Sequence, residues 1–168
     1  MENQLPENAP AASLVAQAVE RMAAAKIAVG LPPLVVLGLY GLVQSLRYGL
    51  RAPEHLIIMI GAVFSIATMI AYGMQAVSRV LDKPSRWGGL IFAGSFVPFL
   101  FAGYIIVTRI FYLYRFGSAA GQGPIIGNVG LLVLAAMCLR AQWKLIEVHL
   151  LAREMAGVAS IGLGRGAP

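Results

Sequence analysis

Charged residues are scarce in this chain of 168 residues: Asp, Glu, Lys and Arg make up 12% of it, whereas hydrophobic residues make up 59%. Globular domains carry roughly 25% charged residues, so the composition excludes a disordered chain, a nucleic-acid-binding domain and an ordinary soluble enzyme. The net charge of +6 fits the basic cytoplasmic loops of a membrane protein better than a contact with nucleic acid. The composition therefore predicts an integral membrane protein, with the lipid bilayer as one of its partners.

Residues that carry chemistry are also few. Cys138 is the only cysteine, which excludes an intramolecular disulfide and a cysteine-rich metal site. His55 and His149 fall at opposite predicted membrane interfaces, so they cannot ligate one haem within one chain. One of them could ligate a chlorophyll-type pigment, but an interfacial histidine more often lies among lipid headgroups. Because the sequence also has no phosphate-binding loop and no nucleophile–base pair, we predict no metal, no cofactor and no enzymatic activity.

Four apolar runs are each about as long as the ~20 residues that cross the hydrocarbon core of a bilayer. They cover residues 27–46, 56–77, 88–108 and 124–143. Runs of this length satisfy their backbone hydrogen bonds in lipid only as helices. The sequence therefore predicts an all-α integral membrane protein, a four-transmembrane-helix bundle with short loops over residues 27–143.

Two tails flank this membrane domain. Within residues 1–26, apolar residues recur at helical spacing after Pro10, which predicts either an interfacial helix lying on the cytoplasmic surface or a plain extension of the first span. The acidic start of the sequence lacks the basic region of a signal peptide, so the first run is expected to remain as a helix. Residues 144–168 are expected to extend the fourth helix into the cytoplasm as far as Met155 and to end in a disordered tail.

The basic residues orient the predicted bundle. One side, which holds both tails and the second loop, carries Arg21, Lys26, Arg79, Lys83, Arg86, Arg140, Lys144, Arg153 and Arg165. The other side carries Arg47, Arg51, Arg109 and Arg115. By the positive-inside rule, both termini are expected in the cytoplasm. Because N-glycosylation acceptors and organelle-targeting signals are absent, we predict a multi-pass protein of the bacterial inner (cytoplasmic) membrane.

Small and polar residues recur at intervals of three and four along the apolar runs. In lipid, helices associate through close contact at small residues and through hydrogen bonds between helices, so these faces are predicted to pack on each other or on a partner. The predicted packing residues are Gly38, Gly41, Ser45, Gly61, Ser65, Thr68, Tyr72, Gln75 and Asn128. A polar conduit is the alternative, although Gln75 and Asn128 lie toward opposite ends of the bundle.

The helix ends carry residues suited to the membrane interface. Arg109 and Arg140 can extend to the headgroups, and Trp87 and Trp143 lie at a shared interface. The alternative for the two arginines is a site for an anionic lipid or cofactor. Pro98 falls within the third helix, where its missing N–H predicts a kink that could act as a hinge. The outer face of this helix is rich in aromatic residues, which suits lipid, a partner helix or a flat cofactor ring.

The most informative absence is that of acidic residues from all four runs. Proton-coupled carriers usually hold a carboxylate near the middle of the membrane, so this absence argues against one. We expect a non-catalytic structural or assembly subunit of a larger membrane complex, of the respiratory, photosynthetic or secretion type, with other membrane-protein subunits as partners. The alternative is a homo-oligomeric channel or small-solute transporter lined by Ser65, Thr68 and Gln75. An enzyme would need clustered His or acidic residues, and only Glu54 lies beside a histidine.

Overall fold

The computed structural model describes residues 9–49, 52–80, 86–116 and 122–164. Regular structure in these ranges is entirely helical: α1 (Ala9–Tyr48), α2 (Pro53–Val80), α3 (Gly88–Gly94), α4 (Val97–Phe116) and α5 (Gln122–Gly164). Four helical segments are long and apolar enough to cross a membrane: Leu14–Tyr48, Pro53–Ser78, Gly88–Phe116 and Pro124–Met155. Each contains one of the apolar runs, so the predicted all-helical architecture with four membrane-length segments is confirmed.

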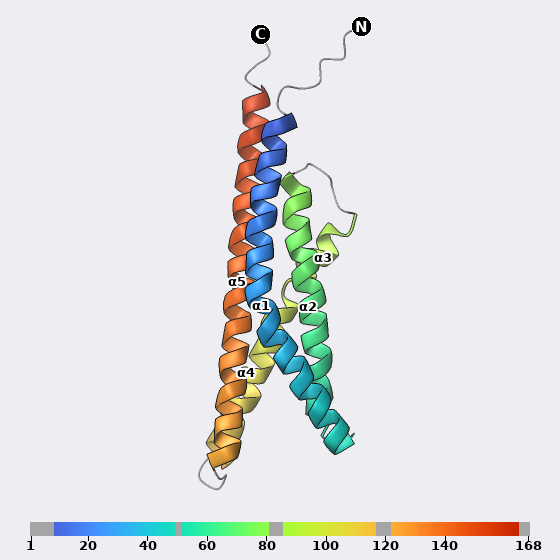
Figure 1. Cartoon of the computed structure of the whole chain (residues 1–168), viewed down its shortest axis with the longest axis vertical. Coiled ribbons are helices and arrows are strands. Elements are labelled where there is room, and N and C mark those ends of the chain that lie inside the picture. Colours follow the sequence, from blue (N-terminus) through green and yellow to red (C-terminus); the bar gives the residue numbers. More distant parts are fainter. Residues whose placement is uncertain (1–8, 50–51, 81–85, 117–121, 165–168) are drawn as a thin grey trace.

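Helix α1 is a single helix of 40 residues that includes Pro32 and Pro33. Proline lacks a backbone N–H and its ring presses on the preceding turn, and α1 changes direction about midway along its length (Figure 1). Residues 9–26 join the first span without a break in the helix. A separate surface helix is not seen in these residues, and residues 1–8 lie outside the described ranges.

The third apolar segment is divided into α3 and α4 just before Pro98, where the sequence predicts one kinked helix over residues 88–108. Pro98 supplies the physical reason, because it has no N–H to bond to the carbonyl of Gly94 and its ring clashes with that carbonyl. The hydroxyl of Ser95 donates to the carbonyl of Phe92 at 2.6 Å and satisfies one acceptor beside the break. Movement about Pro98 as a hinge stays a prediction.

Helix α5 is 43 residues long and continues beyond the predicted end at Met155 to Gly164. Part of the tail that was expected to be disordered is therefore helical, and residues 165–168 lie outside the described ranges. The last part of α5 runs beside the first part of α1 (Figure 1). Their buried contact residues follow the alternating spacing of three and four that is typical of coiled coils. Each is at most 5% exposed: Ala16, Val19 and Ala23 on α1, and Leu145, Val148 and Ala152 on α5.

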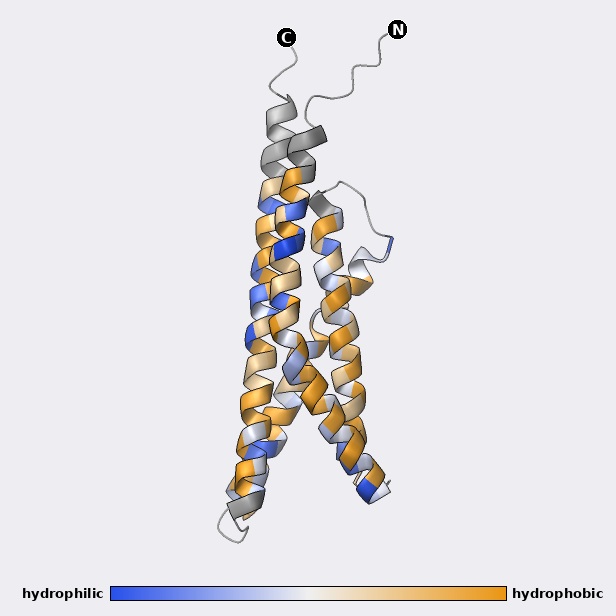
Figure 2. Ribbon diagram, viewed as in Figure 1, coloured by the Kyte–Doolittle hydropathy of each residue, from blue (hydrophilic) through white to orange (hydrophobic). Residues whose placement is uncertain are grey.

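The helices pack with α1 against α2 and α5, and with α4 against α2 and α5. Hydrophobic residues cover most of the helices, and hydrophilic residues gather on the upper, paired parts of α1 and α5 (Figure 2). In the most apolar part of each membrane-length segment, only 28–33% of the residues are buried within the chain. Most of the apolar surface is therefore left to contact lipid or other chains.

Candidate functional site

Arg109 lies at the centre of a polar cluster that joins α2, α4 and α5. The residue is only 6% exposed, on the buried face of α4. Its Nη2 lies 3.5 Å from Oε2 of Glu54 at the start of α2, and its Nη1 donates to Oδ1 of Asn128 on α5 at 3.4 Å. The Nδ2 of Asn128 donates in turn to the carbonyl of Pro124 at 2.7 Å. Three helices therefore meet at one guanidinium group.

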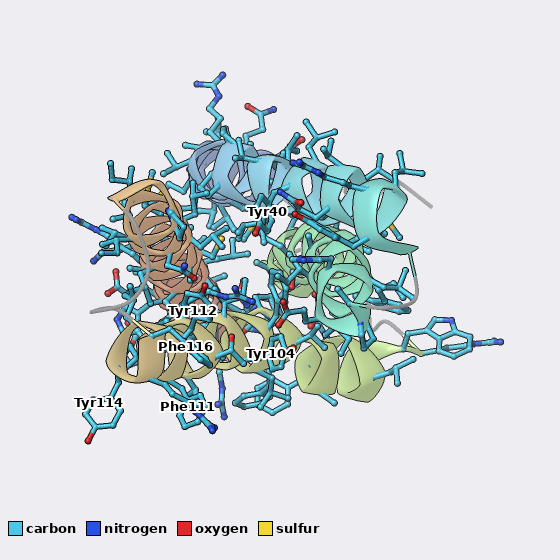
Figure 3. All side chains as sticks on the ribbon, turned by 90° about the horizontal axis from the view of Figure 1, so that it is seen from below. Tyr40, Tyr104, Phe111, Tyr112, Tyr114 and Phe116 are labelled. Atoms are coloured by element: carbon cyan, nitrogen blue, oxygen red, sulfur yellow. The ribbon has the colours of Figure 1, made fainter. Side chains whose placement is uncertain are left out.

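His55 connects the end of α1 to the same cluster. The residue is 8% exposed, and its Nε2 lies 3.7 Å from Oε1 of Glu54. Its ring stacks on Tyr48 with centroids 5.8 Å apart and meets Tyr40 edge-on at 5.9 Å. Figure 3 views the bundle from this end and shows Tyr40 between α1 and α2. All four membrane-length segments thus contribute a residue to the cluster.

The two charges of the cluster are unequally buried. The side chain of Arg109 is 7% exposed and that of Glu54 is 48% exposed, so the cost of desolvation falls mainly on the cation. A buried charge is tolerated when an opposite charge and hydrogen bonds accompany it. Nε and Nη2 of Arg109 have no hydrogen-bond acceptor in the described structure. Glu54 therefore supplies a negative charge beside a guanidinium that is buried in a region of low dielectric constant. The geometry of the cluster is that of a structural cross-link between helices.

Two buried amides hold α3 at both of its ends. Gln75 of α2 donates from Nε2 to the carbonyl of Gly88 at 3.0 Å, where α3 begins. Gln142 of α5 donates from Nε2 to the carbonyl of Ser95 at 2.9 Å, directly after α3 ends. The regular hydrogen bonds of a helix are interrupted there, ahead of Pro98. Side chains of α2 and α5 therefore satisfy and position the backbone at the break.

The predicted packing glycines of α1 lie where α1 crosses α2. A Cβ placed on Gly41 would lie 2.6 Å from the backbone N of Met59 and 2.8 Å from the carbonyl O of His55. The two backbones touch here, and only a glycine allows this approach. One turn earlier, a Cβ on Gly38 would lie 3.4 Å from the Cβ of Ala62, which is an ordinary contact.

The predicted packing residues of α2 face several neighbours. Gly61 lies against the ring of Phe101 on α4, which occupies the place of a Cβ. Tyr72 stacks on His149 of α5, with ring centroids 4.4 Å apart and planes 13° apart. Ser65 is fully buried at 0% exposed, and its hydroxyl has no hydrogen-bond partner in the described structure. The predicted stripe therefore lies in the interior of the bundle and contacts α3, α4 and α5.

Two further predicted packing hydroxyls, like that of Ser65, make no hydrogen bond to another helix in the part of the chain that the structure describes. Thr68 donates to the carbonyl of Phe64 at 2.9 Å, within α2 itself. The Oγ of Ser45 is buried without a hydrogen-bond partner. Thr68 and Ser45 therefore allow close packing through their small size, but they form no hydrogen bond between helices.

The residues predicted at the membrane interface take different positions. Arg109, which was expected to extend to the headgroups, turns inward to Glu54 instead. Glu54 at the start of α2 gives the guanidinium a negatively charged partner, which lipid headgroups would otherwise provide. Trp87 and Trp143 are 68% and 59% exposed. Arg140 is exposed as well and lines a groove between α1 and α5.

The pairing of Glu54 with Arg109 is the feature that sequence reasoning missed. The predicted topology already placed both residues on the same side of the membrane, one at the start of the second span and one at the end of the third. Opposite charges at one depth on two helices are expected to pair, since an unpaired charge there is costly. The opposite charges of Glu54 and Arg109 at the same predicted depth are therefore the signal that could have revealed the cluster.

In the ranges that the structure describes, no three side chains of His, Cys, Asp or Glu lie close enough together to hold a metal ion. Comparisons with models of protein families, with curated proteins and with solved structures find no match for this chain. Its function therefore has to be inferred from the geometry of the chain itself.

Proposed function

We propose that this chain is a non-catalytic structural or assembly subunit of a larger membrane complex. The proposal depends mainly on the outward face of α4, opposite the buried face that carries Arg109. This outer α4 face consists of residues spaced three or four apart, namely Phe96, which directly precedes α4, and Leu100, Gly103, Val107, Phe111 and Tyr114. Its large side chains are 50–90% exposed. Phe111 and Tyr114 point away from the bundle (Figure 3).

Gly103 makes this face suited to another helix. A Cβ placed on Gly103 would meet nothing within 4 Å, so this chain gains no packing from the missing side chain. A glycine inside a helix costs roughly 0.5–1 kcal/mol relative to alanine. A glycine between large apolar residues forms a notch that lets a second transmembrane helix approach closely. Contact with a partner helix would offset that cost, whereas contact with lipid alone would not.

The proposed setting is a bacterial inner membrane with both termini in the cytoplasm. The basis is the excess of basic residues on the side of the two tails. In this orientation, the paired ends of α1 and α5 project into the cytoplasm, where they offer a second place of contact with neighbouring subunits.

A homo-oligomeric channel or small-solute transporter is the alternative. It was expected to use Ser65, Thr68 and Gln75 to line a pore between copies. Ser65 is 0% exposed and Gln75 is 5% exposed, so both would have to leave the core of the chain to face such a pore. This burial favours the subunit proposal over the channel.

Gly103→Leu is expected to release the partner chains. The experiment is purification from native membranes in mild detergent, followed by mass spectrometry and an absorption spectrum of the eluted peak. The unsubstituted chain should elute with other membrane proteins at fixed stoichiometry, with or without pigment. The substituted chain should elute without them, because leucine fills the notch, and its Cβ would meet no neighbouring helix of this chain within 4 Å.

Gly127→Leu on α5 is the matched control: a Cβ at Gly127 also meets nothing within 4 Å, but no exposed large apolar residue lies three or four positions from Gly127, so it forms no notch between such residues. This variant should retain the partner chains. If the unsubstituted chain elutes as a homo-oligomer alone, the subunit proposal fails and flux measurements in liposomes become the test of the channel. If both variants or neither variant lose the partners, the outer α4 face is not the contact surface.

A further inference from the structure

A groove of about 370 Å³ lies between α1 and α5, away from the cluster around Arg109. It is lined by Lys26, Val29, Met137, Arg140, Ala141 and Lys144, and we refer to it as the α1–α5 groove. A Cβ on Gly30 would lie 2.9 Å from the Cβ of Ala141, so the two helices nearly touch at this lining residue. Half of the lining residues are basic, which is unusual in a chain with only 12% charged residues.

The groove has a charged end and an apolar end. Helices α1 and α5 run in opposite directions, and Gly30 lies beside Ala141. This register places Lys26 level with Lys144 at one end of the groove. Arg140 lies one turn before Lys144 in α5, and Met137 lies at the other end of the groove. A ligand that fills the groove must therefore be anionic at one end and apolar at the other.

The depth of the groove matches the edge of the membrane. Lys26 directly precedes the first apolar run at 27–46, and Lys144 directly follows the last run at 124–143. These positions lie at the level of lipid headgroups, and Arg140 can reach the same level from one turn deeper. The charged end of the groove thus lies where phosphate groups of lipids are found.

The groove also carries a net positive charge. Among the described residues, only Lys144 forms an ion pair there, with Glu147 at 2.7 and 2.9 Å. No ion pair of the described chain involves Lys26 or Arg140. Three cations face one carboxylate, so the groove keeps a net positive charge that a bound anion would reduce.

We propose that the α1–α5 groove binds the phosphodiester headgroup of an anionic phospholipid. Arg140 donates to the phosphate oxygens, and Lys26 and Lys144 flank the headgroup as point charges. The acyl chains lie along Met137 and the apolar surface beyond it. Basic pockets between transmembrane helices recognise anionic lipids in this way. The proposal is independent of the subunit role, because lipid binding is measured on the purified chain alone.

The test compares lipid binding by the unsubstituted chain and three variants in detergent, with phosphatidylglycerol and phosphatidylcholine as the probes. Retained lipid is counted by native mass spectrometry and affinity is measured by titration. The unsubstituted chain should prefer phosphatidylglycerol. The triple variant Lys26→Gln, Arg140→Gln and Lys144→Gln should bind it about a hundredfold more weakly, since each of the three basic groups near an anionic headgroup contributes roughly a fivefold factor.

A second triple variant removes the same charge from the same predicted side of the membrane, outside the groove: Arg21→Gln, Arg86→Gln and Arg153→Gln. It should bind phosphatidylglycerol as the unsubstituted chain does. Glu147→Gln should bind it more tightly, because the competing carboxylate is lost. If the first triple variant does not fold, the single variant Arg140→Gln takes its place.

Three outcomes would overturn the proposal. The first is an equal loss of affinity in both triple variants, which indicates general attraction by charge. The second is equal binding of phosphatidylcholine. The third is full competition by inorganic phosphate at equal concentration, which would identify a site for free phosphate rather than for a lipid.

Discussion

Glu54→Ala is expected to destabilise the protein more than removal of the buried cation with which Glu54 is paired. In Glu54→Ala, the guanidinium of Arg109 stays 6% exposed and keeps only a 3.4 Å contact to Asn128. In Arg109→Met, no charge is left inside the protein, because the side chain of Glu54 is 48% exposed and can be hydrated. Removing one partner of a buried pair is costly because of the charge that remains.

The expected cost of Glu54→Ala is about 1–3 kcal/mol of unfolding free energy, at the lower end of the range for buried pairs because one partner is half in solvent. Arg109→Met should cost less than about 1.5 kcal/mol, since methionine fills a similar volume and needs no partner. The measurement is the midpoint of unfolding of the purified protein during titration with SDS, followed by circular dichroism.

The double variant of Glu54→Ala and Arg109→Met distinguishes two causes of the destabilisation by Glu54→Ala. One is the desolvated charge left on Arg109, and the other is the loss of a favourable attraction between the two residues. Once Arg109 is methionine, the further change of Glu54 should have almost no effect on the midpoint. Glu147→Ala serves as the control, because it breaks an exposed ion pair with Lys144 and should leave the midpoint unchanged. If Arg109→Met costs as much as Glu54→Ala, the guanidinium contributes net attraction and the account of the cluster is wrong.

The membrane-length segments could be predicted because their signal is local. A run of apolar residues long enough to cross a bilayer has only one way to satisfy its backbone in lipid. The packing role of the α1 glycines could be predicted for the same reason, since small residues at helical spacing indicate a close contact whatever the partner is. That Gly41 meets the backbone of Met59, whereas Gly38 meets a side chain, depends on the crossing of two helices and has no local signal.

Other features depend on residues that are distant in the sequence. The missing N–H of Pro98 predicts a kink, but the opening of that kink into two helices is supported by Gln142, which bonds the carbonyl of Ser95 from 47 residues away. A cation near the end of a membrane helix is expected to extend to the headgroups, but Arg109 turns to Glu54 because this residue of another helix is a nearer partner. Local rules therefore locate the elements, and contacts between elements decide which way a polar side chain turns.

Gly41→Ala is expected to lower the stability and Gly38→Ala is not, although the two residues lie one turn apart on α1. Alanine has a higher helix propensity than glycine by about 0.5–1 kcal/mol, so the substitution is favourable where space allows. At Gly38 the new methyl group lies 3.4 Å from the Cβ of Ala62, and the midpoint of unfolding should stay the same or rise. At Gly41 the methyl group lies 2.6 Å from the backbone N of Met59, and the helices must separate.

Separation of α1 and α2 at Gly41 should lower the stability by about 1–3 kcal/mol, the usual cost of overpacking, because a backbone cannot rotate away as a side chain can. The loss should also reach His55, whose carbonyl O is 2.8 Å from the new Cβ, and so weaken the contact of that ring with Tyr40. Titration with SDS measures the first effect, and the near-ultraviolet circular dichroism of the tyrosines measures the second. A fall in stability at both glycines, or at neither, would show that α1 and α2 do not cross with their backbones in contact at Gly41.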